Sequence, residues 1–342
     1  MLALHVLRPG LFTTLQDLGR VGYRHLGVPP AGALDPVGPR LANALVGNPP
    51  GEGALELSWL GPALRVEGGA VRVALTGGVA ARRLRAGEAV TLDSGRSHLL
   101  QAGDVLELGA VGGGPVAYLA VEGGFALAPV LGSLATYTRA GLGPLGGRAL
   151  AAGDGLPLNR PASERGEKVL AAPFDYGSGP LRVIAGPQDD HFTPQALATL
   201  VSAEYRVGRD ADRMGLRLEG PVLEHAKTPG IASDGLMAGC IQVPGNGAPI
   251  LLLADHQTVG GYAKIATVIS ADLPRAGRIL PGGALRFRWV GMEEAEAARA
   301  NLERRIAAAI AAMAEPVGGL DLAALYTANL VSGMVSGGED EG

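Results

Sequence analysis

Residues 255–262 read DHQTVGGY and follow PILLLA (249–254), a run as apolar as a buried strand. In this polar segment Asp255 can act as a base, while Gln257 and Thr258 can orient a bound ligand. Polar side chains that converge at the end of a strand are typical of a binding pocket. The alternative is a hairpin whose turn residues bond to their own backbone. Of the two, the site is the interpretation that we favour.

Further candidates stand close to this segment or carry a charge that suits an anion. Lys264 would supply a cation beside it, and Tyr262 and Gln242 would contribute polar contacts to a substrate. Arg213 lies in a charged stretch, 208–221, just before a strand-like run. Because a guanidinium matches carboxylates and phosphates in shape, we expect Arg213 to be an anion clamp. We expect the other charged residues of 208–221 to be solvated at the surface.

Two stretches of the N-terminal half also carry polar groups. The run TLQDLGRVGYRH offers three candidates for substrate binding: Gln16, Asp17 and Arg20. A surface loop with a solvated salt bridge explains the same run equally well. The run LATYTRAG offers Arg139 as a fourth. Its RAG recurs later in the chain, so a structural role for Arg139 is an equally good explanation.

Several kinds of site are excluded by what the sequence lacks. There is no GxxxxGK[ST] phosphate loop, no HExxH motif and no paired-cysteine spacing, and the six histidines are scattered. We therefore expect no metal site. None of the common motifs for catalysis is present, which suggests a protein whose site is completed by a partner.

Composition narrows the class of protein further. The net charge of −4 argues against a nucleic-acid partner. The one cysteine, Cys240, excludes an internal disulfide and is typical of a reducing cytoplasm. The apolar runs are shorter than the roughly 20 residues of a membrane helix, and the first residues have no signal-peptide layout. We expect a cytoplasmic protein that binds neither nucleic acid nor membrane.

The elements that must position these residues are mostly short strands. Apolar residues make up 47% of the chain but aromatic ones only 4%, so the core must be aliphatic. The 54 glycines and 24 prolines punctuate short alternating runs, which indicates a mainly β protein. Helices are expected at 192–205, with Thr193 as its N-cap, and at 293–315. A short docking helix is expected at 320–335.

An internal repeat organises the strands. PVAYLA (115–120) matches PILLLA (249–254), and other matches keep the same order along the chain: LHVLRPG with LRVIAGP, GGF with GGY, RAG with RAG, and GRAL with GRIL. The first copy carries an insertion of loop and helix at 17–48. The sequence therefore predicts two β-rich domains of one fold followed by a terminal region, with the boundaries 1–165, 175–290, and 291–342 for a helix and flexible tail.

The repeat also divides DHQTVGGY, the segment after PILLLA, into a part that both copies share and a part that only the second copy has. Both copies have the strand and a Gly-Gly-aromatic, so we expect these to serve the fold. The DHQT half occurs in the second copy alone. Chemistry is therefore expected at Asp255, Gln257 and Thr258 rather than at Gly260 and Gly261, while the side on which His256 lies stays open.

Ordered motifs carry a resemblance to a known family: FTTLQDLGRVGYRHLGVPPAGALD, LELSWLGPAL, VLGSLATYTRAGLGPLGGR, DRMGLRLEGP and GCIQVPGNGAPILLLADHQTVGGYAKIA. On these, residues 4–290 resemble the family known as allophanate hydrolase subunit 2, as KipA or as the C subunit of 5-oxoprolinase (PxpC). They are also similar to half of the carboxyltransferase domain of urea carboxylase. Two departures stand out: Leu134 replaces an arginine of the family pattern, and Val259 with Ala263 replaces a threonine and a proline.

The resemblance implies a fold, partners and an activity. The fold would be a pair of cyclophilin-like β-barrel domains. The partners would be a KipI-like protein, which is the B subunit of such a complex, and a LamB/YcsF-like protein, which is its A subunit. Together they would open 5-oxoproline to glutamate at the expense of ATP, with ATP and its Mg²⁺ bound by or shared with a partner.

A mechanism follows as a hypothesis from the chemistry of a cyclic amide. Asp255 would act as base near the amide N–H, and Lys264, Arg213 and Arg20 would stabilise developing negative charge. Two alternatives stay open. One is a biotin-dependent carboxyltransferase acting on a urea-like amide with biotin on a separate carrier. The other is a non-catalytic KipA-type protein that binds a KipI-type kinase inhibitor.

Overall fold

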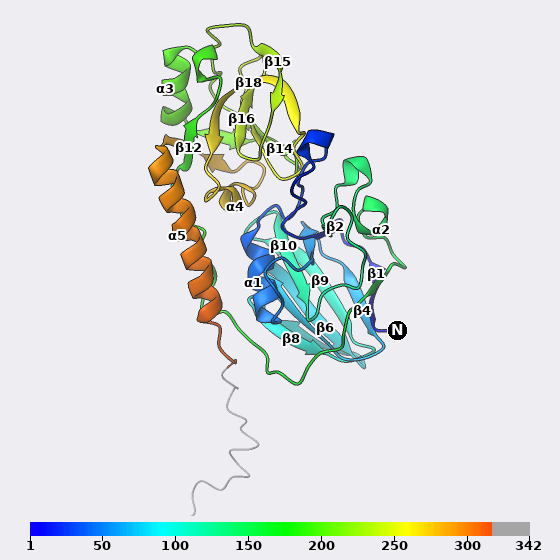
Figure 1. Cartoon of the computed structure of the whole chain (residues 1–342). Coiled ribbons are helices and arrows are strands. Elements are labelled where there is room, and N and C mark those ends of the chain that lie inside the picture. The colour runs from blue at the N-terminus through cyan, green and yellow to red at the C-terminus, as the bar shows by residue number, and fades with distance from the viewer. Residues whose placement is uncertain (317–342) are drawn as a thin grey trace, which may run out of the picture.

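The computed structural model describes residues 1–316, and the predicted docking helix at 320–335 and the tail lie outside this part. The chain is mainly β and forms two lobes, one above the other in Figure 1. The N-terminal lobe takes its strands from residues 3–157, and the C-terminal lobe takes its strands from residues 181–289. Three sheets make up the two lobes. The expected mainly β class is confirmed.

Two antiparallel sheets form the N-terminal lobe. In spatial order the six-stranded sheet runs β11 (Gly155–Pro157), β1 (Ala3–Arg8), β4 (Ala63–Glu67), β9 (Val105–Gly112), β6 (Gly78–Arg85) and β7 (Glu88–Leu92). The five-stranded sheet runs β2 (Phe12–Gln16), β3 (Ala54–Ser58), β10 (Val116–Val121), β5 (Val71–Thr76) and β8 (Arg96–Leu100). Alternate residues of each sheet face the other sheet, as the pleat of a strand requires.

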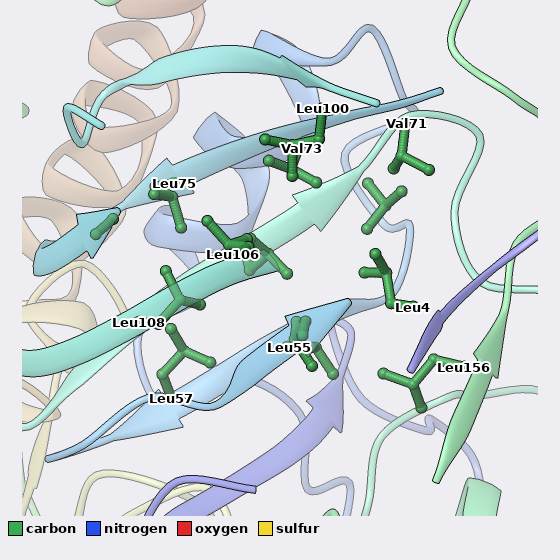
Figure 2. Packing of buried hydrophobic residues seen from close by; sticks show 14 of the residues in the cluster. Leu4, Leu55, Leu57, Val71, Val73, Leu75, Leu100, Leu106, Leu108 and Leu156 are labelled. Atoms are coloured by element: carbon green, nitrogen blue, oxygen red, sulfur yellow. The ribbon is translucent and has the colours of Figure 1, made fainter. Parts of the chain in front are cut away.

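The core of the N-terminal lobe lies between these sheets. Figure 2 shows Leu4 and Leu106 from one sheet and Leu55 and Val73 from the other pointing into the same space, and all four are fully buried. The cluster consists almost wholly of leucine and valine, which confirms the aliphatic core that the composition predicts. The helix α1 (Val37–Leu45) covers the outer face of the five-stranded sheet over β10 and β5.

The C-terminal lobe is a single nine-stranded sheet. Eight strands run in the order β19 (Ala284–Leu285), β13 (Tyr205–Val207), β14 (Gly215–Glu219), β17 (Ile250–Leu252), β16 (Cys240–Val243), β18 (Val259–Val268), β12 (Leu181–Ala185) and β20 (Phe287–Trp289), and β15 (Gly230–Gly235) pairs with β18. The strands at the two ends, β19 and β20, are consecutive in the chain with Arg286 between them. The sheet therefore curls until its edges nearly meet and form an almost closed barrel.

Helices are few, as expected. The predicted helix at 192–205 is α3 (Pro194–Ser202), and Thr193 is its N-cap, because its Oγ1 accepts the Ala196 N–H at 3.1 Å. The remaining short helices are α2 (Pro144–Gly147), α4 (Leu273–Ala276) and the 3-10 turns η1 (Arg24–Leu26), η2 (Thr138–Ala140) and η3 (Asp189–His191).

The helix predicted at 293–315 is α5 (Met292–Ala311), which runs along both lobes in Figure 1. Near its start Ala295 and Ala298 pack against Ile269 of the C-terminal lobe. Two turns further on, Leu302 and Ile306 pack against α1 of the N-terminal lobe. Apolar residues recur at helical spacing along α5, so one continuous apolar face packs against both lobes.

The two repeat copies agree at the strand and differ after it. PVAYLA forms β10 and PILLLA forms β17, and each is paired on both sides within its sheet. GGF and GGY, both expected to serve the fold, have different conformations. Gly123 and Gly124 make a left-handed turn, with φ of 81° and 75°, whereas GGY lies in β18. The chain turns at once after β10 but makes the loop 253–258 after β17 before it re-enters the sheet.

Candidate functional site

A cavity of about 450 Å³ lies between the two lobes. Both lobes line it with apolar side chains, among them Phe12, Trp59, Leu216 and Ile279. Trp59 adopts a left-handed φ of 63° and remains 43% exposed. A bulky residue held in that conformation is uncommon, and such backbone strain tends to gather at functional sites. Four charged side chains share the lining: Arg139, Asp212, Arg213 and Asp255.

Asp255 is placed in the wall by the loop that follows β17. Its backbone N–H donates to the Arg213 carbonyl at 2.9 Å. Its carboxylate accepts two N–H groups of the Arg213 side chain, Nε at 2.9 Å and Nη2 at 2.8 Å. The fork geometry fixes both carboxylate oxygens. The sequence predicts both residues as site residues, and the structure brings them together.

Arg213 is committed to protein partners. Besides Asp255, it donates through Nη1 to Glu56 and through Nη2 to the Gly32 carbonyl at 2.6 Å. Burial alone would lower the pKa of Arg213, but the carboxylates of Glu56 and Asp255 outweigh it and the pKa is raised. Four of the five N–H groups of this guanidinium therefore point at protein atoms. Such an arginine positions a carboxylate rather than clamping a free anion.

Glu56 is a member of this charged cluster that sequence reasoning missed. It lies on β3, in which every residue is buried, and its Oε2 accepts the Leu34 N–H and the Tyr118 O–H, both at 2.8 Å. Burial, and then the charges of Glu56 and Asp35, raise the pKa of Tyr118 well above its ordinary value. A signal was present: a carboxylate in a strand that reads ALELS is costly unless it is paired.

The triad Glu56–Arg213–Asp255 is thus a buried unit that joins the two lobes. Glu56 belongs to the N-terminal lobe, and the other two belong to the C-terminal lobe. Two carboxylates share one guanidinium, so the unit carries a net charge of −1 when all three are ionised. Only Asp255 of the two acids lines the cavity. The excess negative charge therefore faces a ligand through Asp255 and favours a group that brings an N–H or a proton.

A second ion pair crosses the cavity lining near the surface. Arg139, on η2 of the N-terminal lobe, donates to Asp212 of the C-terminal lobe at 3.1 Å, and the side chains are 57% and 51% exposed. Asp212 and Arg213 are consecutive, so one short loop contacts the other lobe twice, with opposite charges. The predicted contact residue Arg139 is therefore part of the cavity lining.

Lys264 lies elsewhere. It is buried in β18, and its Nζ donates to Asp234 of β15 at 2.6 Å. The lysine is not among the residues that line the interlobe cavity. The structure therefore gives it a carboxylate partner on a neighbouring strand and does not bring it beside Asp255 at the cavity.

The predicted polar residues around the start of β18 form their own small group. Gln257 donates to the Gln242 side chain at 3.4 Å, and Gln242 donates to the Tyr262 carbonyl at 3.5 Å. Thr258 is buried, whereas Tyr262 is 47% exposed. All four lie outside the cavity lining. His256 is buried with its Nδ1 2.6 Å from the Gln257 carbonyl, and burial lowers its pKa.

The three candidates from the N-terminal lobe hold a neighbouring loop. Asp17 accepts the Ser133 hydroxyl and the Leu134 N–H, both at 2.7 Å. Gln16 donates to the Thr136 carbonyl at 3.0 Å, and Arg20 donates to the Ala135 carbonyl. Burial lowers the pKa of Arg20, although the charges of Asp17 and Asp255 oppose this. These residues fix the loop that leads to Arg139, and none lines the cavity itself.

Two negative findings apply to residues 1–316. No group of three or more His, Cys, Asp or Glu side chains in that range is placed to hold a metal ion. No helix in it is long and apolar enough to cross a membrane.

Comparison with known proteins places the chain among carboxyltransferase-related sequences. The family described as carboxyltransferase domain, subdomain A and B, matches residues 26–289. The chain is 36% identical over 303 residues to the C subunit of 5-oxoprolinase from Escherichia coli, covering 88% of this chain and 96% of that protein. It is 32% identical to the protein of the same name from Haemophilus influenzae, covering 85% and 92%.

Longer proteins contain a similar part. Urea amidolyase of Lachancea kluyveri is 32% identical over 83% of this chain, but the match covers 17% of that protein. The crystal structure of the K. lactis urea amidolyase superimposes with a TM-score of 0.81 at 28% identity, over 90% of this chain and 20% of that one. The chain therefore spans about a fifth of those large enzymes and nearly all of the smaller bacterial proteins.

Proposed function

The chain belongs to the family of the carboxyltransferase domain, subdomain A and B, and on that premise we propose that it is the C subunit of an ATP-dependent 5-oxoprolinase. The complex would convert 5-oxo-L-proline to L-glutamate with hydrolysis of ATP. The observation that carries the proposal is the match in length: 96% of the E. coli protein is covered, against 17% of the urea amidolyase.

The cavity chemistry supports an amide substrate. 5-Oxoproline presents a ring N–H, a carbonyl and a carboxylate. Asp255, held by two N–H groups of Arg213, would accept the ring N–H and take its proton as the amide is activated. Glu56 and Arg213 act as positioning residues for that carboxylate. The apolar walls, with Trp59 and Phe12, would exclude water from the ring and strengthen these polar contacts.

The other predicted residues have a more indirect place in this proposal. We propose that Gln16, Asp17 and Arg20 shape the loop that carries Arg139. Lys264, Gln242, Gln257, Thr258 and Tyr262 form a separate polar group at β18 and β15, which we propose is completed by a partner protein.

The remaining parts of the proposal concern partners and location. The partners would be a KipI-like protein in the role of the B subunit and a LamB/YcsF-like protein in the role of the A subunit, and the complex would be cytoplasmic. ATP with its Mg²⁺ would be bound by or shared with a partner.

We also propose the finer description of the fold. Both lobes would be cyclophilin-like barrels, with domain boundaries at 1–165 and 175–290 and a C-terminal region at 291–342. The nearly closed sheet of the C-terminal lobe supports this directly. The two facing sheets of the N-terminal lobe would then be an opened and flattened version of the same barrel.

The test is reconstitution. The chain is co-produced with a KipI-like and a LamB/YcsF-like protein, and ATP hydrolysis is measured with and without 5-oxoproline. We expect ATP hydrolysis that depends on 5-oxoproline and on all three chains, with glutamate as product. Hydrolysis that proceeds equally well without this chain would refute the proposal.

A second candidate is a biotin-dependent carboxyltransferase that acts on a urea-like amide. The TM-score of 0.81 with the urea amidolyase favours it, and biotin would have to arrive on a separate carrier. Avidin separates the two candidates, because it blocks a reaction that needs biotin and leaves an oxoprolinase unaffected.

A further inference from the structure

We propose that the Arg139–Asp212 ion pair is a gate that the carboxylate of the substrate opens. The incoming carboxylate would take the place of the Asp212 carboxylate on Arg139, which makes Arg139 the residue that selects substrates with a carboxylate. This inference rests on the proposed oxoprolinase function and adds a specificity mechanism to it.

The pair lies in the solvent-exposed part of the cavity lining. Both residues line the cavity, and they come from different lobes. They are joined by one hydrogen bond, from Nη2 of Arg139 to Oδ2 of Asp212, at 3.1 Å. The two side chains are about half exposed. An exposed ion pair contributes about 0–1 kcal/mol, so a ligand can replace it without a large loss.

The two partners differ in how firmly they are held. Asp212 is anchored by its own turn, because its Oδ1 accepts the Met214 N–H at 2.8 Å and the Gly215 N–H at 3.3 Å. Arg139 makes no other side-chain hydrogen bond within residues 1–316. When the pair breaks, the arginine is therefore the partner that moves, and its long side chain can follow a ligand into the cavity.

Two arginines line the cavity, and Arg139 is the one with N–H groups available to bind a ligand. The guanidinium of Arg213 already donates to Asp255, Glu56 and Gly32. A ligand carboxylate that reached the Arg213–Asp255 end would meet the net negative triad and be repelled. The charges therefore set the direction of binding: a carboxylate at Arg139 and an N–H group at Asp255.

A gate makes a prediction that a simple structural bridge does not. Removing Arg139 removes the group that binds the ligand, while neutralising Asp212 removes its competitor. In the reconstituted complex, Arg139→Gln should raise KM for 5-oxoproline by about 10- to 100-fold, the range for a lost charge-assisted bond. Asp212→Asn keeps the oxygen that accepts the Met214 N–H, and it should lower KM severalfold.

Two controls complete the experiment. Arg148→Gln removes an arginine of similar exposure that pairs with Asp154 outside the cavity, and it should leave KM unchanged. 2-Pyrrolidinone, the same ring without the carboxylate, should inhibit the wild type, R139Q and D212N with similar strength.

The outcomes separate this inference from the proposed function. If KM moves in the same direction in R139Q and D212N, or in neither, Arg139 and Asp212 form a structural bridge and the gate is refuted. If 2-pyrrolidinone inhibition changes as much as KM does, selection by the carboxylate is refuted. A wild-type complex without 5-oxoproline-dependent ATP hydrolysis would overturn the proposed function instead.

Discussion

Each lobe buries an acid shortly after an equivalent strand, and the two acids have different surroundings. In the N-terminal lobe Glu122 follows β10 by one residue. It is 1% exposed, lies 3.3 Å from Arg72 and is also close to Arg160 and Arg165. In the C-terminal lobe Asp255 pairs with one arginine and faces the interlobe cavity.

The difference shows what the shared fold supplies and what it does not. A strand end places a buried carboxylate in both lobes, so burial and an arginine partner are common properties. Glu122 also accepts the Ser163 N–H and ties down the segment between the lobes. Asp255 has the same kind of partner but faces the other lobe. Whether the carboxylate lines the interlobe cavity therefore depends on which way the strand end points.

The largest expected effect contrasts these two acids directly. Asp255→Asn should lower turnover of the reconstituted complex by about 10²- to 10⁴-fold, because the proposed base is lost. Glu122→Gln should keep turnover and lower the melting temperature, since breaking a buried ion pair costs about 3–5 kcal/mol. Turnover and thermal melts of both variants test the comparison. Equal losses of activity would mean that both acids act through the fold.

The next prediction tests whether Glu56 acts on Asp255 through Arg213. Glu56→Gln changes the net charge of the triad from −1 to 0, and we expect turnover to fall by about 10-fold or more. Tyr118→Phe removes one donor to Glu56 but keeps the charge of the triad, so it should lower turnover less than Glu56→Gln does. Steady-state turnover of both variants measures this, and wild-type turnover in Glu56→Gln would contradict the coupling.

The third comparison uses the glycines of the two RAG copies. A Cβ on Gly277 would overlap the carbonyl oxygen of Leu34 in the other lobe, so Gly277→Ala should cost about 1–3 kcal/mol and also reduce turnover. A Cβ on Gly141 would meet Gly146 at an ordinary 3.6 Å, although its φ of 62° strains an alanine by about 1 kcal/mol. Gly141→Ala should therefore lower the melting temperature alone. Unchanged turnover in Gly277→Ala would show that the lobe contact does not shape the cavity.

The smallest effect compares one buried histidine from each lobe. Burial lowers the pKa of His98 and of His256 below the ordinary 6.5. The unfolded chain then binds more protons below pH 6.5, so stability falls as the pH falls from 6.5 through the lowered pKa values. His98→Gln and His256→Gln should each reduce this slope by at most about 1.4 kcal/mol per pH unit. Urea melts between pH 5 and 7.5 measure it, and a slope that neither variant changes would exclude both histidines.

Local features of the fold were predictable from the sequence. The aliphatic core, the N-cap at Thr193 and the helix at Met292–Ala311 follow from composition and spacing, which act over a few residues. The lobe contacts were not predictable in this way. Glu56 and Arg213 are separated by 157 residues, and their pairing depends on how two finished sheets dock.

Long-range docking of the sheets also explains why only some of the predicted site residues meet at the cavity. Asp255 and Arg213 were predicted because each stands beside a strand end, and the structure joins them. Lys264 belongs to the same sequence segment as Asp255, yet β18 carries it away to Asp234. The nearness of two residues in sequence predicts a shared site only while the chain stays in one loop.

The helix α5 has a consequence for the order in which the protein is made. It contacts both lobes but is the last described helix to be synthesised. At about 5–20 residues per second, the stretch from Pro157 to Ala311 takes on the order of 10–30 s. During that time Val37 and Leu41 of α1 lack the cover that Leu302 and Ile306 of α5 give them in the complete chain. This apolar strip is buried by α5 only when synthesis has passed Ile306.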